Sequence, residues 1–371
     1  MTQEALQNGS HYVEPADVPL VDFRALTSPD TNRRRVAVAL LDAAFREWGF
    51  VQLHNHGIGA DKLHEAFQWA ERFFMQPTAT KELIAHPPSG DVDTNRGWAR
   101  VGLGYTVHME FDADKAAAIR QQNPDCKETL ELGNPFDATL PPNPWLPEGT
   151  LPGFRGFLEG WWTDCAILAH DLYRCLGEAL RIIMDQNDHD DYFNRIHSAN
   201  DCHMTWNYYP AMSARALNVD GAKRLNAHTD FGSLTLVFQD AVGGLEVHDG
   251  HQFRPIMPVP GALIVNVGDM LEQLSNGRWR SSLHRVVAPA PLMLPPIQGV
   301  PGDDSHGLET KEEKMVVDRY SLVFFGVPNP NEVIAIAPGC ETPGKWKPNM
   351  CGNWGTLTAR QWIRKRLAME F

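Results

Sequence analysis

The sequence lacks the signals that mark several large classes of protein. Its 33 Lys and Arg residues are outnumbered by 46 Asp and Glu residues, which gives a formal net charge of -13 at pH 7. A chain of this charge is repelled by nucleic acids and by anionic lipids. It has no run of about 18 apolar residues that could cross a membrane, and its polar start resembles no secretion signal. We therefore expect no nucleic-acid partner and no membrane partner.

Cysteine is scarce, and common catalytic motifs are missing. The 6 Cys residues include no C-x-x-C pair, so neither a disulfide framework nor a zinc knuckle is indicated, and a cytoplasmic location fits best. The chain contains no P-loop, no G-x-S-x-G elbow and no H-E-x-x-H helix, which argues against a nucleotide-phosphate enzyme, a serine hydrolase and a zinc hydrolase. With 371 residues, of which 43% are hydrophobic, the chain can still bury a large core and form one or two domains.

The first half of the chain mixes strand and helix patterns. After a polar tail at 1–16, residues 17–199 are predicted to form an α/β N-terminal region. Short strands are expected at 18–23 and 49–57, and helices at 33–50, 61–75 and 157–184, from the spacing of their apolar residues. The Pro- and Gly-rich stretch at 86–153 is predicted to form long ordered loops.

The second half changes character. Between 200 and 337, short runs rich in Val, Leu, Phe and Thr alternate with Gly, Pro, Asn and Asp, a pattern typical of a sandwich or jelly-roll barrel. Residues 338–371 end in a basic amphipathic helix pattern. We therefore predict a mainly β fold with flanking helices, in which 200–337 form the β-barrel core.

The sharpest local signal is His228-Thr229-Asp230 at the head of a predicted strand. Alternation along the strand places the imidazole and the carboxylate on one face. His284 begins another predicted strand and could lie beside them. Two histidines and one carboxylate leave three positions of an octahedral ion open, which is the ligand set of non-haem Fe(II) oxygenases.

His-x-Asp by itself is weak evidence, because 15 His residues produce it by chance. It recurs at His189-Asp190-Asp191, in a polar acidic stretch. A rival pair, His54-x-His56, leads into a His-Gly turn and is followed by no carboxylate at strand spacing. A solvated loop or a packed core histidine is the commoner meaning of either pattern.

Two further pairs at the same spacing strengthen the metal hypothesis. Arg319 and Ser321 share a face of one predicted strand, and a guanidinium beside a hydroxyl suits a carboxylate ligand. Asn207 and Tyr209 share a face of another and offer amide and phenol groups to an oxygen-rich anion. Together the pairs describe a metal beside a carboxylate-binding pocket inside a barrel.

From about residue 17 to 335, the chain resembles the Fe(II)- and 2-oxoglutarate-dependent dioxygenases of the isopenicillin N synthase-like family. The motifs that carry the likeness are HTDFGSLTLVFQD, VNVGDMLEQLSNGRWRSSLHRV and RYSLVFF, together with VPLVDF and EWGFVQLHNHGI near the start. The resemblance implies a double-stranded β-helix (jelly-roll) core. It also implies that His228, Asp230 and His284 bind Fe(II), that Arg319 and Ser321 hold the distal carboxylate of 2-oxoglutarate, and that Asn207 and Tyr209 assist.

The resemblance implies a reaction as well. With O2 as second cosubstrate, 2-oxoglutarate is converted to succinate and CO2 while a small organic molecule is hydroxylated, desaturated or rearranged, as in many secondary-metabolic relatives. Candidate substrate-pocket residues are the arginine of Arg96-Gly97-Trp98, Tyr105, Phe231 and Phe325. The interval between His284 and Arg319 is longer than usual for the family, which predicts an insertion at about 290–314, either a surface loop or a lid.

Three alternatives stay open at this point. An iron oxidase of the isopenicillin N synthase or aminocyclopropane-carboxylate oxidase type would keep the triad without using 2-oxoglutarate. A non-catalytic metal-binding barrel would need the three ligands alone, and a zinc hydrolase is weaker still. We expect a small-molecule substrate and a monomer or homodimer.

Overall fold

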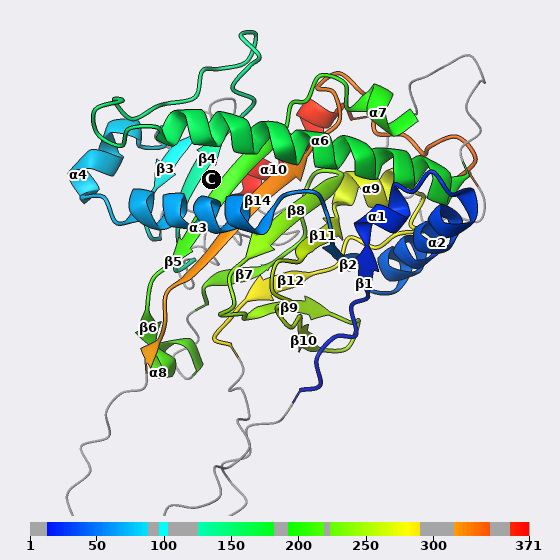
Figure 1. Ribbon diagram of the computed structural model, residues 1–371, viewed down its shortest axis with the longest axis horizontal. Coiled ribbons are helices and arrows are strands. Elements are labelled where there is room, and N and C mark those ends of the chain that lie inside the picture. The colour runs from blue at the N-terminus through cyan, green and yellow to red at the C-terminus, as the bar shows by residue number, and fades with distance from the viewer. Residues whose placement is uncertain are drawn as a thin grey trace, which may run out of the picture.

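A large mixed sheet forms the centre of the computed structural model, which describes residues 13–87, 96–102, 125–181, 192–218, 223–289, 315–341 and 357–370. The sheet has eight strands (Figure 1). In spatial order these are β1 (Leu20–Asp22), β2 (Phe50–His54), β11 (Leu263–Val267), β8 (Leu234–Gln239), β14 (Arg319–Gly326), β5 (His203–Tyr209), β4 (Glu128–Leu132) and β3 (Gly97–Ala99).

A smaller sheet of four strands completes the barrel. Its order is β10 (Phe253–Pro255), β9 (Leu245–His248), β12 (His284–Val286) and β7 (Leu225–His228). From β5 to β14 the chain passes repeatedly between the two sheets, as in a jelly roll, so the predicted fold class is confirmed. A separate ribbon pairs β6 (Met212–Ser213) with β13 (Met315–Val316).

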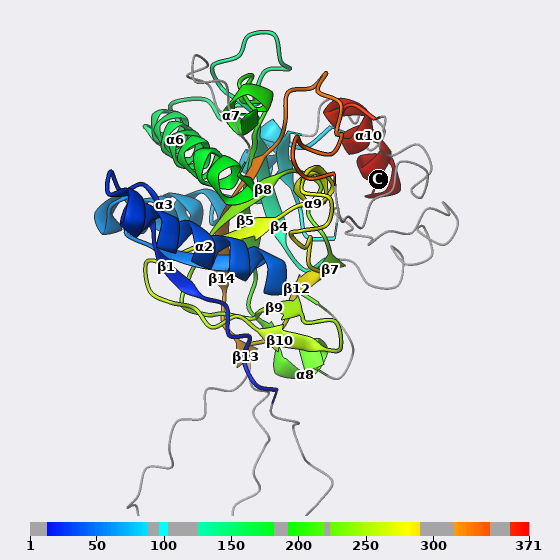
Figure 2. The same ribbon diagram turned by 90° about the vertical axis from the view of Figure 1, so that its right-hand side faces the viewer.

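Helices cover one face of the large sheet and leave the other to the site. Helices α2, α3 and α6 lie on one side, and α10 lies on the opposite side (Figure 2). The helices are α1 (Phe23–Leu26), α2 (Thr31–Glu47), α3 (Ala60–Phe74), α4 (Thr78–Lys81), the 3-10 turn η2 (Glu82–Ile84), α6 (Phe154–Leu180), α7 (Tyr192–Ile196), α8 (Ala214–Asn218), α9 (Asp269–Leu274) and α10 (Ala359–Glu370). Among the helices described, none is both long and apolar enough to cross a bilayer.

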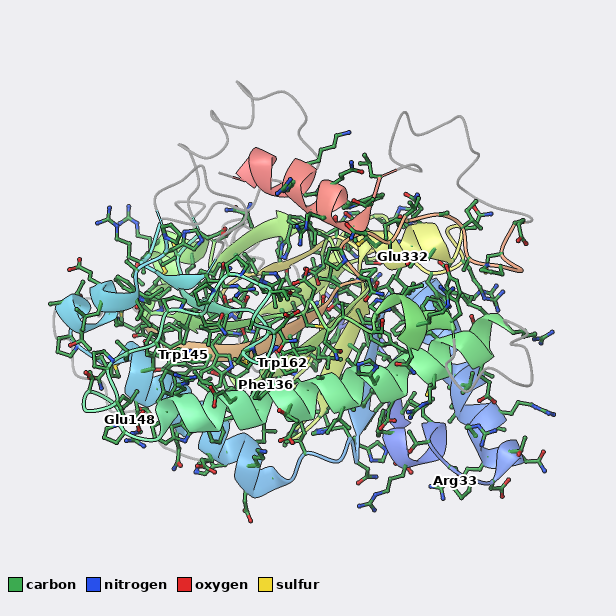
Figure 3. All side chains as sticks on the ribbon, turned by 90° about the horizontal axis from the view of Figure 1, so that it is seen from above. Arg33, Phe136, Trp145, Glu148, Trp162 and Glu332 are labelled. Atoms are coloured by element: carbon green, nitrogen blue, oxygen red, sulfur yellow. The ribbon has the colours of Figure 1, made fainter. Side chains whose placement is uncertain are left out.

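Helix α6 shows how the sequence pattern produces this layer. Its buried residues recur every three or four positions, which gives one apolar stripe along 27 residues. The helix ends where Arg181 adopts a left-handed conformation with φ 54°. Trp162 packs edge-on against Phe136, from the loop that crosses α6 (Figure 3). The stripe covers the apolar face of the sheet and forms the main core.

The two faces of the large sheet have opposite chemistry. On β14, Leu322 and Phe324 belong to the main core under the helices. The alternate residues Arg319 and Ser321 point to the interior between the sheets, because successive side chains of a strand point to opposite faces. The barrel interior is therefore polar where the site forms.

Most predicted elements are confirmed, and two predictions are wrong. The stretch at 86–153 was predicted to be loops, but it supplies β3 and β4, because the backbone of β4 pairs with β5 along five residues. His228 was predicted to head a strand, whereas it ends β7 and Asp230 lies in the following turn. Most of the polar tail, His189, Tyr105 and the 290–314 insertion lie outside the described residues.

Candidate metal centre and cosubstrate pocket

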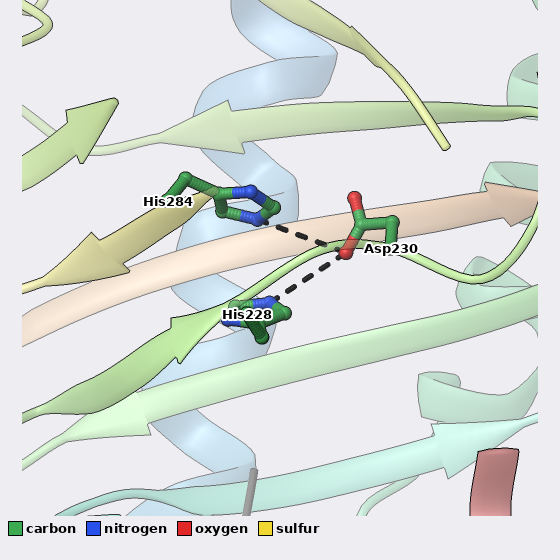
Figure 4. A group of neighbouring side chains, drawn as sticks. All are labelled: His228, Asp230 and His284. Carbon is green, nitrogen blue, oxygen red and sulfur yellow. Dashed lines mark ion pairs between the residues drawn. The ribbon is translucent and has the colours of Figure 1, made fainter. Parts of the chain in front are cut away.

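Strand pairing brings the three predicted metal ligands together. β7 and β12 are antiparallel neighbours in the small sheet, with His228 directly opposite His284. The Nε2 atoms of these two residues lie 3.6 and 3.7 Å from Oδ1 of Asp230 (Figure 4). One potential ligand atom from each residue lies within 4.8 Å of the others.

Hydrogen bonds orient both imidazoles toward this point. Nδ1 of His228 lies 2.9 Å from the Asn226 carbonyl, and Nδ1 of His284 lies 3.0 Å from the Ser282 carbonyl. A carbonyl only accepts, so each Nδ1 carries the proton and each Nε2 presents its lone pair. The ring of Phe50 packs edge-on against His284, at 5.4 Å between centroids.

The carboxylate of Asp230 is held in the same way. Its Oδ2 accepts hydrogen bonds of 2.6 Å from both the Thr235 hydroxyl and the Asn266 amide, so Oδ1 is left to face the imidazoles. Burial opposes ionisation, but electrostatic interaction with His284 and His228, the contact with His228 and the hydrogen bond from Thr235 hold the pKa of Asp230 well below its ordinary value. The group is an anion at neutral pH.

The pKa values of the two histidines shift in opposite directions. Burial and the charge of His228 lower the pKa of His284 to about 4, so this imidazole is neutral near pH 7. Burial also disfavours the charged form of His228, but Asp230 outweighs it and raises the pKa of His228. Two imidazole nitrogens and one carboxylate oxygen are a donor set that fits Fe(II).

The turn that carries Asp230 is fixed by close backbone contacts and by α10. The amide of Asp269 donates to the Asp230 carbonyl at 2.8 Å. Arg366 of α10 donates to the Asp269 carboxylate at 2.8 Å, and its guanidinium lies 4.4 Å from the centre of the Phe231 ring. Gly268 allows this approach, because a Cβ there would collide with the Gly232 carbonyl.

The four predicted cosubstrate residues meet on neighbouring strands. β14 and β5 pair so that Arg319 lies opposite Tyr209 and Ser321 lies opposite Asn207. All four are buried, and the Asn207 amide donates to the Ser321 hydroxyl at 3.4 Å. Arg319 donates to the Gly243 carbonyl at 2.8 Å and to Gln239 at 3.1 Å, but within the described part of the chain its Nη1 has no hydrogen-bond partner. A carboxylate would supply the missing acceptor.

The predicted substrate residues fall at different places. Phe325 shares the interior face of β14 with Ser321. It lies opposite Thr235, the residue whose hydroxyl donates to Asp230. Phe231 follows the metal ligand directly and is covered by Arg366. Arg96 is buried, donates to the Pro141 carbonyl and packs against Gly133.

Two charged residues of the site escaped the sequence analysis. Lys127, just before β4, and Glu131, within it, lie on the interior face by alternation, beside the strand that carries Asn207. The Lys127 ammonium lies 3.4 Å from Oδ1 of Asn207. Burial raises the pKa of Glu131, and its Oε2 has no hydrogen-bond partner in the ranges that the structure describes. The signal was the alternation in KETLEL, hidden in a stretch read as loops.

The rival histidines lie elsewhere. The His56 ring is buried, with Nε2 2.9 Å from the Gly261 carbonyl and an edge-on contact to Phe238. His54 contacts the neighbouring Asn55 side chain at 2.8 Å. Among the described residues, the group able to hold a metal is the one formed by His228, Asp230 and His284.

Comparisons with known proteins agree with this geometry. Residues 18–148 match the family described as non-haem dioxygenase in morphine synthesis N-terminal, and residues 200–293 match the 2OG-Fe(II) oxygenase superfamily. The 2-oxoglutarate-dependent dioxygenase lolO2 of Epichloe uncinata is 40% identical over 97% of this chain and 96% of its own. The proline hydroxylase buaE of Petromyces alliaceus is 36% identical over 84% and 88%.

Solved structures give the same result. The crystal structure of a full-length Neurospora crassa protein in complex with alpha-KG and thymine matches with a TM-score of 0.76 and 27% identity, over 95% of this chain and 96% of that one. These matches confirm the resemblance of the sequence motifs. The chain belongs to the Fe(II)- and 2-oxoglutarate-dependent dioxygenases of the isopenicillin N synthase-like type.

Proposed function

We propose that His228, Asp230 and His284 bind the Fe(II) of this dioxygenase, and that Arg319, Ser321, Asn207 and Tyr209 hold 2-oxoglutarate. The observation that carries the proposal is the convergence of two Nε2 atoms and one carboxylate oxygen, each fixed through the other polar atom of its side chain. The unpaired Nη1 of Arg319 supports the position of the distal carboxylate. The 2-oxoglutarate-dependent relatives favour this function over an iron oxidase that does not use 2-oxoglutarate.

The residues perform mainly orientation. When bound, Fe(II) with 2-oxoglutarate and O2 supplies the oxidation of a small organic molecule, with release of succinate and CO2. Thr235 and Asn266 keep the Asp230 carboxylate aimed, and the carbonyls of Asn226 and Ser282 keep both imidazoles in the required tautomer. Arg319 and Ser321 set the depth at which a dicarboxylate lies.

We place the substrate beside two neighbouring strands. These are β4, which belongs to the N-terminal α/β region (17–199), and β5, which belongs to the catalytic core (200–337). Phe231 and Phe325 offer apolar contacts, and Lys127 and Glu131 offer charges of both signs. The buried Oε2 of Glu131, which has no hydrogen-bond partner among the described residues, favours a substrate with a protonated or hydrogen-bonding nitrogen. A relative named as a proline hydroxylase agrees with that class, and we assign the reaction to secondary metabolism.

We further propose that the enzyme works in the cytoplasm as a monomer or homodimer. In the described part of the chain, five cysteines are free thiols, which supports a reducing compartment. Size-exclusion chromatography with light scattering measures the oligomeric state directly.

An anaerobic titration tests the site. Fe(II)-loaded protein is titrated with 2-oxoglutarate while the weak visible band of a chelated 2-oxo acid is recorded. The parent shows the band, Asp230→Ala does not retain Fe(II), and Arg319→Met retains Fe(II) but requires far more 2-oxoglutarate. Equal Fe(II) affinity in Asp230→Ala and the parent would remove the ligand assignment.

A further inference from the structure

A second buried arginine, Arg224, lies near Arg319. Arg224 directly precedes β7, the strand that ends in His228, and its exposed fraction is 0%. Its Nη2 donates to the carbonyl of Val317, two residues before Arg319. Its Nε and Nη1 are buried and have no hydrogen-bond partner among the residues that the structure describes. The N–H groups of a buried guanidinium without acceptors are costly, and the fold keeps them here.

The two arginines share their surroundings. Arg319 is 1% exposed and also has an unpaired, buried Nη1. Burial and the charge of Arg319 lower the pKa of Arg224, and the Tyr209 phenol lies close to both side chains. Two buried cations near each other repel, so the pocket favours an anion between them.

The nearby carboxylates of Asp240 and Asp318 attract Arg224 electrostatically, but neither accepts a hydrogen bond from it among the described contacts. Asp240 accepts from the amides of Val242 at 2.9 Å and Tyr320 at 2.6 Å. Asp318 accepts from the Tyr208 hydroxyl at 3.1 Å and the Ala211 amide at 2.6 Å. In the described part of the chain, Arg224 forms no ion pair with either carboxylate.

We propose that Arg224 is a second arginine for the distal carboxylate of 2-oxoglutarate, which it binds together with Arg319. The proposal rests on the cosubstrate pocket assigned above and adds a residue to it. A carboxylate has two oxygens and about four acceptor positions, enough for both guanidinium groups and the Ser321 hydroxyl. The consequence is strong selection for a dicarboxylic 2-oxo acid over a monocarboxylic one.

The test compares two ligands in two proteins. Fe(II)-loaded parent and Arg224→Met are titrated anaerobically by calorimetry with 2-oxoglutarate and with 2-oxopentanoate, which has the same chain length but no distal carboxylate. We expect Arg224→Met to bind 2-oxoglutarate about 10- to 100-fold more weakly, as for loss of a hydrogen-bonded charge partner. Its affinity for 2-oxopentanoate should equal that of the parent or exceed it, because one buried charge has been removed.

Other outcomes overturn the proposal. An equal loss for both ligands would show that Arg224 only maintains the fold of the pocket, and no loss for either would show that it faces elsewhere. Lys223→Met, at the neighbouring position, is the matched control and should bind both ligands as the parent does. If Arg319→Met loses affinity for 2-oxoglutarate and Arg224→Met does not, the assignment of the cosubstrate pocket is kept and the proposed role of Arg224 is rejected. Failure of the parent to bind 2-oxoglutarate overturns both assignments.

A measurement on the unaltered protein avoids dependence on the folding of a variant. A crystal structure of the parent with Fe(II) and 2-oxoglutarate, grown without O2, should place a nitrogen of Arg224 within hydrogen-bond distance of the distal carboxylate. A structure in which Arg224 contacts water or protein alone would refute the proposal.

Discussion

The orientation of the Asp230 carboxylate should depend on the hydroxyl group of Thr235. Thr235, 3% exposed, donates to Oδ2 of Asp230 at 2.6 Å. Thr235→Val keeps the shape of the side chain and removes that hydrogen bond. A hydrogen bond to a charged group contributes about 1.5–3 kcal/mol, and loss of a comparable partner of a metal ligand lowers affinity by about 10- to 100-fold. We expect Thr235→Val to bind Fe(II) about 10- to 100-fold more weakly than the parent. Some affinity should remain, because the Asn266 amide still donates to Oδ2 of Asp230.

Anaerobic competition with a chelator of known Fe(II) affinity measures the effect. Thr205→Val is the matched control, because Thr205 is buried on the interior face of β5 and donates no hydrogen bond to Asp230 among the contacts described. The control should bind Fe(II) as the parent does. Unchanged affinity in Thr235→Val, with the fold intact by circular dichroism, would refute the argument that this hydroxyl aims the ligand.

Three further predictions concern stability. Burial lowers the pKa of His197 to about 3, so below the unfolded pKa of about 6.5 the unfolded chain binds a proton that the folded chain excludes. From pH 7 to pH 5 the parent should therefore lose about 2 kcal/mol more unfolding free energy than His197→Gln does. Equal losses in urea melts would contradict this. Glu131→Gln removes a carboxyl group whose buried Oε2 lacks a hydrogen-bond partner among the described residues, and should gain about 1 kcal/mol of unfolding free energy. Glu128→Gln breaks the 2.6 Å pair with Lys81 and should lose stability. The reverse order in thermal melts would contradict the assignment of the two faces of β4. Arg366→Met leaves Asp269 without its cation and should cost about 3 kcal/mol, and a cost near zero in urea unfolding would show that the pair is solvated.

The cluster of His228, Asp230 and His284, which we propose binds Fe(II), was predictable because its signal is local. His228 and Asp230 are two residues apart in sequence, and His284 begins a run whose residues favour a strand. The prediction survived an error in the strand boundary, since the turn after β7 directs Asp230 to the point that alternation would have given. The spacing of His228 and Asp230 therefore predicted that their side chains meet, although it did not predict where the strand ends.

The rest of the site depends on pairings that span the chain. β4 is short and lies between Pro- and Gly-rich segments, so its strand character is apparent only from its partner β5. Lys127 and Glu131 become site residues through that pairing. Arg224 has no motif, because its meaning depends on burial and on the distant Arg319.

The contact of α10 with the Asp230 turn links the metal centre to the order of synthesis. The ribosome delivers His228, Asp230 and Asp269 long before Arg366, so the carboxylate of Asp269 first enters the folding barrel without its arginine. The ion pair between Arg366 and Asp269 forms only when α10 docks. Iron retention should therefore require α10, and a fusion or protease cut that keeps α10 away should yield a folded barrel that loses its metal.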